Sequence, residues 1–337
     1  MKPAIRAGFS SDPGIVTLSD CRLVGRSSGQ TDESLISFFS VTDFDDPPIL
    51  QVGRTVLQGG GTCIEVACNE ASVLFGLGNC VLRDAYYGVR MQGVPTTPDP
   101  FHGALLHCTL RNLEVAVDEP SSFLQLFDVN FRFNLFEGNG LDVGSNVNFD
   151  PLSSDNYTDL TPPSGTSSFT QVSGLSGMFA DCTEMLRPDA TILGVVSSGS
   201  GIDLYGRTYT GDSDPGAVYH FSADQLVTQH PAVGEDVCLA THGPAGDTWF
   251  LVVGTSLVST TPYALQVNPV DYPAFGAVDS TGFAQYPGTG QTPITIPNQP
   301  AFYTTPLYWQ VGFQDPVTMA LTFTHSAIRT DAGSIAE

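Results

Sequence analysis

Three arginines stand at the same place in a phrase that this chain repeats. The phrase reads DCRLVG at residues 20–25, NCVLRD at 79–84 and HCTLRN at 107–112, with altered copies TVLQG at 55–59 and VNFRF at 129–133. We number each copy from its Cys, or from the residue replacing it, as position zero. Position +3 then holds the arginine stripe, which comprises Arg83, Arg111 and Arg132 and follows Val24 and Gln58. Guanidinium groups bind carboxylate or sulfate through paired hydrogen bonds, so the stripe predicts contact with nearby acids or with an acidic glycan.

Three carboxylates lie close to the stripe in sequence. Asp84 follows Arg83, Glu114 comes three residues after Arg111, and Asp128 belongs to the last copy. Stacked arginines repel one another unless acids or a bound anion compensate them, so a structural role and a ligand-binding role both remain open. The same carboxylates could flank a glycosidic bond, because hydrolysis needs two carboxyl groups about 5 to 10 Å apart. An adjoining column alternates in sign and is predicted to be structural: Glu65, Arg90 and Asp118.

His107 stands directly before Cys108, where the repeat gives it Asn79 and Asp128 as neighbours. A contact between histidine and aspartate could serve acid–base catalysis, and a turn histidine capped by a neighbour is the structural alternative. The other histidines form no HExxH motif or tight pair, and they include His220, His230, His242 and His325. Zinc catalysis is therefore not predicted.

Two further motifs suggest chemistry. Asn146, Asn148 and Asp150 alternate as calcium ligands do, which predicts a possible calcium site, but the glycine and final glutamate of an EF-hand are missing. GRSSG at residues 25–29 matches the G-x-S-x-G nucleophile elbow of α/β-hydrolases and would make Ser27 a nucleophile. A serine and glycine turn explains the same letters, and the chain lacks the alternation of strands with long helices that such hydrolases have.

The elements that position these residues follow from the same repeat. Apolar residues occupy position +2 (Leu23, Leu57, Leu82, Leu110, Phe131), position −3 (Leu18, Val52, Leu77, Leu105, Leu126) and position +9 (Ile64, Val89, Val117). This alternation is typical of strands. Successive copies are separated by 34, 25, 28 and 21 residues, which fits coils of a parallel β-helix with loop insertions. Like residues of successive coils are expected to stack in columns.

The cysteines fit this interpretation as small buried side chains. Position zero holds Cys21, Cys80 and Cys108, and the chain contains 7 cysteines without a CxxC pair. Disulfide or metal roles remain the alternatives, with Cys63 and Cys68 close in sequence. An odd number leaves at least one thiol free or bonded to another chain.

Composition limits the partners. The chain has 12 Lys and Arg against 35 Asp and Glu, a net charge of −23, which argues against nucleic acid or an anionic membrane as main partner. No apolar run is long enough to span a bilayer, and the first residues lack the hydrophobic stretch of a secretory signal. The chain is expected to be the trimmed part of an exported protein.

The pattern changes near residue 222. Residues 1–221 are predicted to form the β-helix, and residues 222–337 contain alternating strands between Gly and Pro turns, which predict a small β-sandwich. A sandwich of this kind would cover the open end of the last coil.

The columns and the stretch from Met178 to Phe221 resemble secreted bacterial right-handed parallel β-helix proteins of the pectate-lyase-like superfamily. The final coils of that family are matched by Phe179 and Asp181, Leu186 and Pro188, Asp203 and Gly206, and Gly216 and Ala217. The segments GPAG…WFLVVG and IPNQPAFYTTPLYWQVGFQDP are similar to C-terminal modules of large exported proteins of aquatic bacteria. The resemblance implies an extracellular or cell-surface location, and fold alone leaves the activity open.

Two classes of function follow. In the first, the protein processes an acidic polysaccharide, as a glycoside hydrolase through Asp84, Glu114 and Asp128 or as a lyase. The resemblance implies that a lyase would use an arginine base, with calcium neutralising the uronate. In the second, the protein is a non-catalytic surface, adhesion or glycan-binding protein. A serine-dependent esterase is a minor alternative.

Overall fold

The computed structural model describes residues 5–9, 14–25, 33–40, 46–68, 73–93, 101–120, 127–180, 183–187, 190–196, 200–228, 231, 234–288, 291–297 and 305–331. The predictions made for Ser27, Leu126, Asp181, Pro188 and His230 lie outside these residues. The chain divides into two compact units, which are described separately. The first comprises Met1–Ser176 and Gly194–Val218, and the second comprises Gly177–Leu193 and Tyr219–Glu337.

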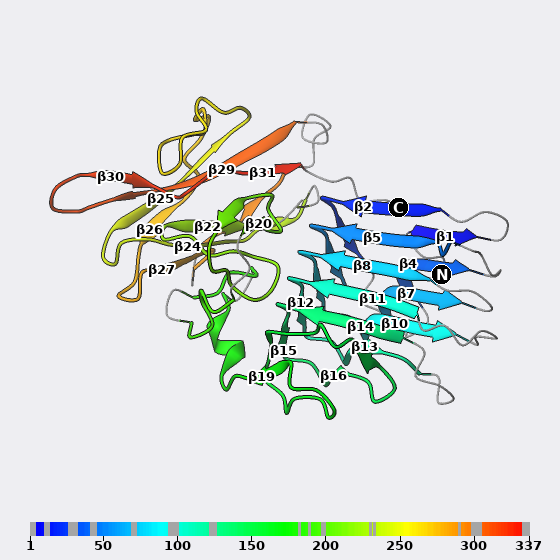
Figure 1. Ribbon diagram of the computed structural model, residues 1–337. Coiled ribbons are helices and arrows are strands. Elements are labelled where there is room, and N and C mark those ends of the chain that lie inside the picture. The colour runs from blue at the N-terminus through cyan, green and yellow to red at the C-terminus, as the bar shows by residue number, and fades with distance from the viewer. Residues whose placement is uncertain are drawn as a thin grey trace. The chain divides into compact units, whose positions relative to one another are not determined.

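Three parallel sheets build the first unit, and each coil adds one strand to sheet A, then to sheet B, then to sheet C (Figure 1). Sheet A contains β1 (Ile5–Phe9), β4 (Ser34–Ser40), β7 (Thr62–Cys68), β10 (Tyr87–Gly93), β13 (Val115–Asp118) and β16 (Leu141–Val143). Sheet B contains β2 (Ile15–Ser19), β5 (Ile49–Gly53), β8 (Leu74–Gly78), β11 (Phe101–Leu106), β14 (Phe127–Arg132) and β17 (Asn148–Phe149). Sheet C contains β3 (Arg22–Val24), β6 (Val56–Gln58), β9 (Val81–Arg83), β12 (Thr109–Arg111), β15 (Leu135–Glu137), β18 (Asn156–Thr158) and β19 (Phe169–Gln171). This is the predicted parallel β-helix.

The strand registers confirm the predicted apolar columns. Sheet C aligns Leu23, Leu57, Leu82 and Leu110, and sheet A aligns Ile64, Val89 and Val117. Sheet B aligns Leu18, Val52, Leu77 and Leu105. Most of these side chains are fully buried in one continuous core. Burying a side chain of this size contributes about 1.5–3 kcal/mol, so each buried member of a column stabilises the coils by about this amount.

The predicted fifth copy was placed five residues too early. Leu105 pairs with Phe131 and Leu110 pairs with Phe136, so position zero of the fifth coil is Asn134, and Val129 lies at position −5. The copy VNFRF therefore belongs to the sheet B strand of that coil. The error arose because this coil replaces the cysteine of the phrase with asparagine.

Asparagine continues the position-zero column in the last coils. The Asn134 side chain accepts a hydrogen bond from the Cys108 backbone N–H at 2.8 Å and donates to the Leu105 carbonyl at 2.8 Å. It also donates to Oδ1 of Asn156, one coil further on, at 2.9 Å. Each buried amide is thus paired with the backbone or with its copy, as buried polar groups require.

The stretch expected to form the final coils has a different structure. In the described residues after β19, the first unit contains the antiparallel hairpin β20 (Ser200–Ile202) and β21 (Thr208–Thr210), and none of these residues joins a parallel sheet. The N–H of Gly216 donates to the Phe133 carbonyl at 2.7 Å, and that of Ala217 donates to Oγ1 of Thr109 at 3.0 Å. These bonds hold the segment against earlier coils, because its Gly and Pro turns break the strand repeat.

The second unit is antiparallel. One sheet contains β22 (Asp224–Val227), β24 (Leu239–His242) and β27 (Phe283–Tyr286), and a second pairs β23 (Asp236–Val237) with β28 (Ile294–Thr295). The largest contains β26 (Phe275–Ala277), β25 (Thr248–Gly254), β29 (Pro306–Gln314), β30 (Leu321–Phe323) and β31 (Ile328–Asp331). A 3-10 helix, η1 (Leu175–Met178), spans the sequence boundary between the units.

The sheets of the second unit share a buried aromatic core. Trp249 of β25 contacts Tyr286 of β27 edge to face, with ring centroids 6.3 Å apart, and Trp309 is almost fully buried. Gln225 of β22 donates to the Trp309 carbonyl of β29 at 2.5 Å. This packing of antiparallel sheets is the predicted sandwich.

No helix among the described residues is both long and apolar enough to cross a bilayer.

Candidate functional site

A groove of about 690 Å³ lies on the first unit where sheet C turns into sheet A. It is lined by four successive turns of the β-helix, and its residues are Gly60, Asp84, Ala85, Tyr86, Asn112, Leu113, Glu114, Gly138, Asn139 and Gly140. A volume of this size falls within the range of ligand sites, about 300–1,000 Å³. We call it the turn groove.

The sequence forms these turns because of the first residue of each. Gly59, Asp84, Asn112 and Gly138 align at position +4 and all have positive φ, between 52° and 77°. Glycine adopts this conformation without strain, and Asp and Asn tolerate it better than other residues. Glycine therefore lines the ends of the turn groove, while the two middle coils present polar side chains.

The Asp84 carboxylate is held by side-chain amides of both neighbouring coils. Gln58 donates to its Oδ2 at 3.0 Å, and Asn112 donates to its Oδ1 at 3.2 Å. These bonds fix an exposed acid at the floor of the turn groove. A ladder that joins three coils can orient a carboxylate for binding without burying it.

Glu114 and Tyr86 occupy equivalent third positions in adjacent turns, and both are exposed. A Cβ atom added to Gly140 would lie 2.7 Å from the Glu114 carbonyl oxygen and 3.4 Å from its carboxyl carbon. The absence of a side chain at Gly140, one coil further on, therefore makes room for Glu114. The Tyr86 ring is 41% exposed and meets the ring of Tyr87 edge on, with centroids 4.7 Å apart. The turn groove thus combines an open aromatic face with two carboxylates and an amide.

The arginine stripe is different from the predicted one. The +3 column reads Val24, Gln58, Arg83, Arg111 and Glu137, because the corrected fifth coil ends its phrase in an acid. The guanidinium Nε of Arg111 lies 2.6 Å from Oε2 of Glu137, and the two side chains are only 13% and 4% exposed. Arg83 donates to the Gln58 side chain at 3.3 Å and lies 3.8 Å from the Asp84 carboxylate. Arg111 is therefore compensated within the column, and Arg83 by the neighbouring Asp84 at position +4.

Arg132 belongs to another column. It pairs with Leu106 in sheet B, and its guanidinium lies 5.0 Å from the Phe133 ring centroid. Its inclusion in the arginine stripe was wrong, because the fifth copy was placed five residues too early. Asp128 also lies in sheet B, where its partners are His102 and Asn148. The structure therefore brings together Asp84 and Glu114 but not Asp128.

His107 does not face Asp128. Its ring packs on the Phe133 ring at 4.8 Å and on that of Tyr209 at 6.4 Å. Burial lowers the pKa of His107 to about 4, a bond with the Asp214 backbone opposes this shift, and the charge of Arg132 reinforces it. The predicted contact between His107 and Asp128 was wrong, and the histidine is a neutral corner residue at physiological pH.

The three predicted calcium ligands point to different partners. The Asn146 amide donates to the Glu119 carbonyl at 2.9 Å, and Asn148 pairs with Asp128 across sheet B. Oδ1 of Asp150 accepts the Leu152 N–H at 2.7 Å, which is a local turn. The calcium site stays a prediction.

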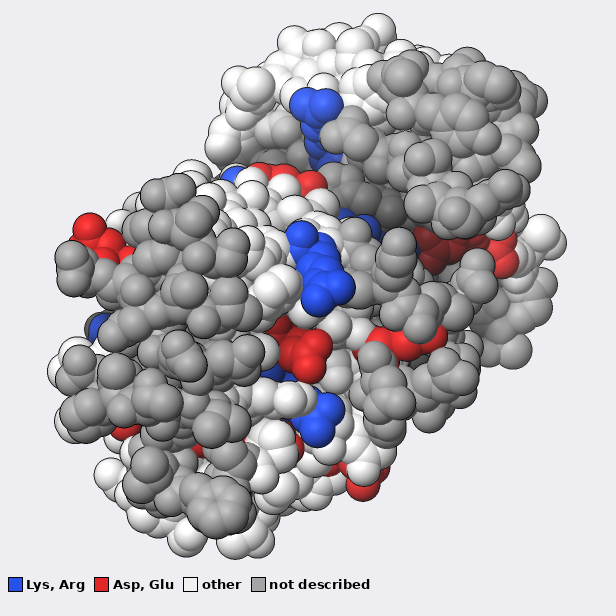
Figure 2. Space-filling view, turned by 90° about the vertical axis from the view of Figure 1, so that its right-hand side faces the viewer, with Lys and Arg blue, Asp and Glu red and all other residues white. Residues whose placement is uncertain are grey.

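The alternating column of Glu65, Arg90 and Asp118 has the predicted register. Burial raises the pKa of Asp118, and the nearby charge of Arg90 lowers it. Figure 2 shows basic and acidic side chains interleaved on one face of the molecule, with no broad patch of one sign among its described atoms. A surface of this kind favours internal compensation over attraction of a polyanion.

The cysteines of the coils are core residues as predicted. Cys63, Cys80 and Cys108 are fully buried free thiols, and Cys21 is a partly buried one that contacts the Thr55 hydroxyl at 3.5 Å. Burial raises the pKa of the Cys63 thiol to about 12. Cys238 in the second unit is disulfide-bonded.

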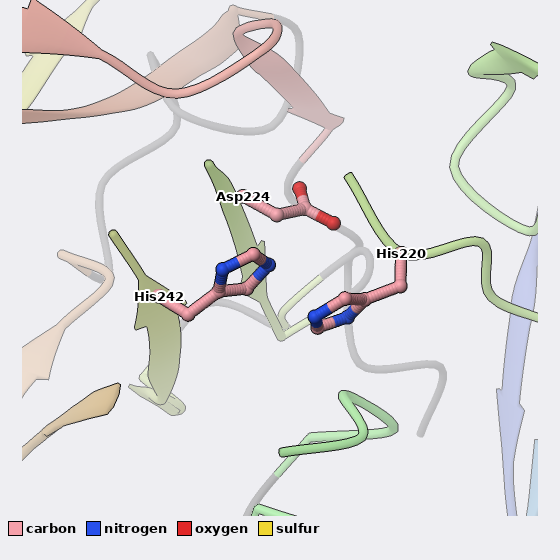
Figure 3. A group of neighbouring side chains, drawn as sticks. All are labelled: His220, Asp224 and His242. Atoms are coloured by element: carbon pink, nitrogen blue, oxygen red, sulfur yellow. The ribbon is translucent and has the colours of Figure 1, made fainter. Parts of the chain in front are cut away.

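Sequence reasoning missed one cluster in the second unit. His220, Asp224 and His242 bring one potential ligand atom each to within 4.8 Å of one another (Figure 3). Asp224 and His242 are directly paired between β22 and β24, whereas His220 precedes β22. The spacing of 4 and 18 residues carries no motif, so only the antiparallel register reveals the cluster.

Comparison with known proteins leaves the family open. No protein-family model and no curated protein matches this chain.

Proposed function

We propose that this protein binds a polysaccharide outside the cell, and that the turn groove is the binding site. The observation that carries the proposal is the presence of Tyr86, Asp84, Asn112 and Glu114 in one open groove of about 690 Å³. An exposed aromatic ring offers an apolar face for a sugar ring, and carboxylates and amides accept and donate hydrogen bonds to hydroxyl groups.

The charges favour a neutral glycan over the acidic one expected from the arginine stripe. The turn groove presents the carboxylates of Asp84 and Glu114, and its lining residues include no arginine or lysine. Of the stripe arginines beside the groove, Arg111 is paired with the buried Glu137, and Arg83 lies 3.8 Å from the Asp84 carboxylate. A uronate or sulfate would be repelled by the groove acids without a cation to compensate them.

Hydrolysis is the second candidate, favoured by one observation. Asp84 and Glu114 come from adjacent coils and line the same groove. Glycoside hydrolases use two carboxyl groups, about 5–5.5 Å apart when they retain configuration and about 6.5–9.5 Å apart when they invert it. A lyase has less support, because Arg111 is engaged with the buried Glu137 carboxylate at 2.6 Å and does not line the turn groove.

The extracellular location and the pectate-lyase-like identity are parts of the same proposal. The disulfide of Cys238 supports an oxidising compartment. The parallel coils support the superfamily, although the segment that resembled its final coils folds differently. Parallel β-helices have many activities, so the function is inferred from the residues of the turn groove and not from the fold.

Calorimetric titration with neutral, uronic and sulfated oligosaccharides tests the proposal. We expect a neutral oligosaccharide to bind, and Tyr86→Ala and Glu114→Gln to weaken its affinity by about 10-fold or more, which corresponds to the loss of about 1.4 kcal/mol. Tyr272→Ala is the matched control, because Tyr272 is an exposed tyrosine of the second unit. Binding that survives both groove substitutions, or the absence of binding across the panel, would refute the proposal.

The same panel separates the reaction types. New reducing ends that disappear in Asp84→Asn and Glu114→Gln would establish hydrolysis. Unsaturated products detected in the ultraviolet would establish elimination. Binding without either product would leave the protein as a glycan-binding protein.

A further inference from the structure

The cluster of His220, Asp224 and His242 lies in the second unit and is independent of the turn groove. Two of its members are fixed by strand pairing, because Asp224 of β22 lies opposite His242 of β24. Their side chains are 1% and 4% exposed, and His220 is partly exposed. Figure 3 shows the carboxylate beside the two imidazole rings, with all three side chains converging.

The backbone orients the Asp224 carboxylate. Its Oδ1 accepts the Gln225 N–H at 2.7 Å, and its Oδ2 accepts the Phe221 N–H at the longer distance of 3.4 Å. These two backbone donors fix the direction of the carboxylate oxygens. Hydrogen-bonded carboxylates of this kind are typical ligands of protein-bound metals.

The two imidazoles stack face to face. Their centroids are 4.0 Å apart and their planes differ by 13°, so the nitrogen lone pairs of the two rings lie in nearly parallel planes. Both nitrogens can reach one ion if one ring turns about its Cβ–Cγ bond. His220 lies on the segment before β22, whereas His242 is held within a sheet, so the inference requires His220 to be the ring that turns.

We infer that His220, Asp224 and His242 form a binding site for a divalent transition metal ion, of which Zn²⁺ is the representative. Two imidazole nitrogens and a carboxylate oxygen are the ligands that Zn²⁺ and its first-row neighbours prefer, whereas Ca²⁺ and Mg²⁺ require oxygen ligands. Ligand distances of about 2.0–2.2 Å require the ligand atoms, now within 4.8 Å of one another, to move closer together, which the turn of one imidazole ring would allow. Three protein ligands leave a coordination position for water or a bound molecule.

Titration of the chelator-treated full chain, purified without a polyhistidine tag, with Zn²⁺ alone tests the inference. We expect one ion per chain, with the affinity reduced by more than about 100-fold in both His220→Gln and Asp224→Asn, a larger loss than the about 10- to 100-fold typical of supporting residues. His102→Gln is the matched control, because His102 is an exposed histidine of the first unit. An excess of Mg²⁺ should not displace the ion.

His220→Gln keeps the test decisive if Asp224→Asn fails to fold, since His220 is outside the strands. A native circular dichroism spectrum shows that each variant is folded. Substitution of Co²⁺ should give visible absorption that is lost in His220→Gln. A folded native chain that binds no Zn²⁺, or binding unaffected by His220→Gln, would overturn the inference.

Discussion

The two units bury their polar groups in different ways. In the β-helix, a buried polar side chain is paired with the backbone or with the equivalent residue of the next coil, as Asn134 is with Asn156. In the second unit, polar groups that occur once converge from different segments, as the buried Asp224 and His242 do with the partly exposed His220. The two patterns have different physical requirements.

The difference separates structural groups from binding groups. A repeated column must neutralise itself coil by coil, because like charges directly opposite one another are destabilising. In the column of Gln58, Arg83, Arg111 and Glu137, Arg111 is paired with Glu137. Arg83 lies opposite Arg111 and has the Asp84 carboxylate of the adjoining column 3.8 Å away. A group that occurs once is under no such constraint, so its ligating atoms can be directed at a bound ion. Side chains on the outer turns, such as Tyr86 and Glu114, are similarly free to vary between coils.

Removing the buried charge partner should have the largest effect on stability. Arg111→Leu leaves the Glu137 carboxylate without its guanidinium, which costs about 3–5 kcal/mol in a buried pair. Arg54→Leu is the matched control, because Arg54 pairs with Asp20 at 2.5 Å but the side chains are 32% and 51% exposed. Exposed pairs contribute about 0–1 kcal/mol. Urea denaturation at neutral pH measures both.

The double substitution Arg111→Leu with Glu137→Leu sharpens this result. It removes both charges, so most of the lost stability should return. If Arg111→Leu and Arg54→Leu lower the free energy of unfolding equally, the buried ion pair of Arg111 with Glu137 does not contribute the stability expected of it.

Removal of one ladder amide should cost less. Asn134→Ala leaves the Cys108 N–H and the Leu105 carbonyl without their side-chain partner, an expected loss of about 3 kcal/mol. Gln225→Ala is the counterpart in the second unit, where Gln225 also bonds to Trp309 and Val311. Hydrogen exchange should show lost protection in the coils around Asn134 for the first and around β22 and β29 for the second. Exchange that rises equally throughout the chain in both variants would contradict the local role of the ladder.

Acid should destabilise the β-helix through His107. Its pKa of about 4 lies below the ordinary value of 6.5, so the unfolded chain binds more protons between these values. The stability is complete above pH 6.5 and is lost as the pH falls toward 4, by about 2 kcal/mol between pH 7 and pH 5. His107→Asn, a residue suited to the positive φ of this corner, should remove that part of the pH dependence, and His102→Asn should not. An unchanged slope in His107→Asn would show that other groups control acid unfolding.

The apolar columns could be predicted from sequence because each coil repeats apolar residues at the same positions. Leu57, Leu82 and Leu110 follow position zero at a fixed distance, and local alternation is enough to align them. The fifth coil was misplaced because Asn134 replaced the cysteine, although NLFEG at residues 134–138 keeps the same order of apolar residue, polar residue and glycine as TVLQG. Aligning these two segments would have placed Glu137 at position +3 of the fifth coil.

The candidate sites were predictable only in part. Asp84 and Glu114 could be predicted because acids were expected beside the arginines, whereas Tyr86, an uncharged residue at the same place in its coil as Glu114, was missed. The cluster of His220, Asp224 and His242 depends on the pairing of β22 with β24, which no repeat encodes. Antiparallel pairing over such distances depends on the whole sandwich, so a local pattern does not indicate it.

The central claim is that the stripe arginine supports the coil and the turn groove binds the glycan. The affinity of the folded Arg111→Leu and Glu137→Leu double variant for the neutral oligosaccharide, compared with that of Glu114→Gln, tests it most directly. The double variant should bind as the native protein does, and Glu114→Gln should bind about 10-fold more weakly. A double variant that loses binding while Glu114→Gln retains it would contradict the claim.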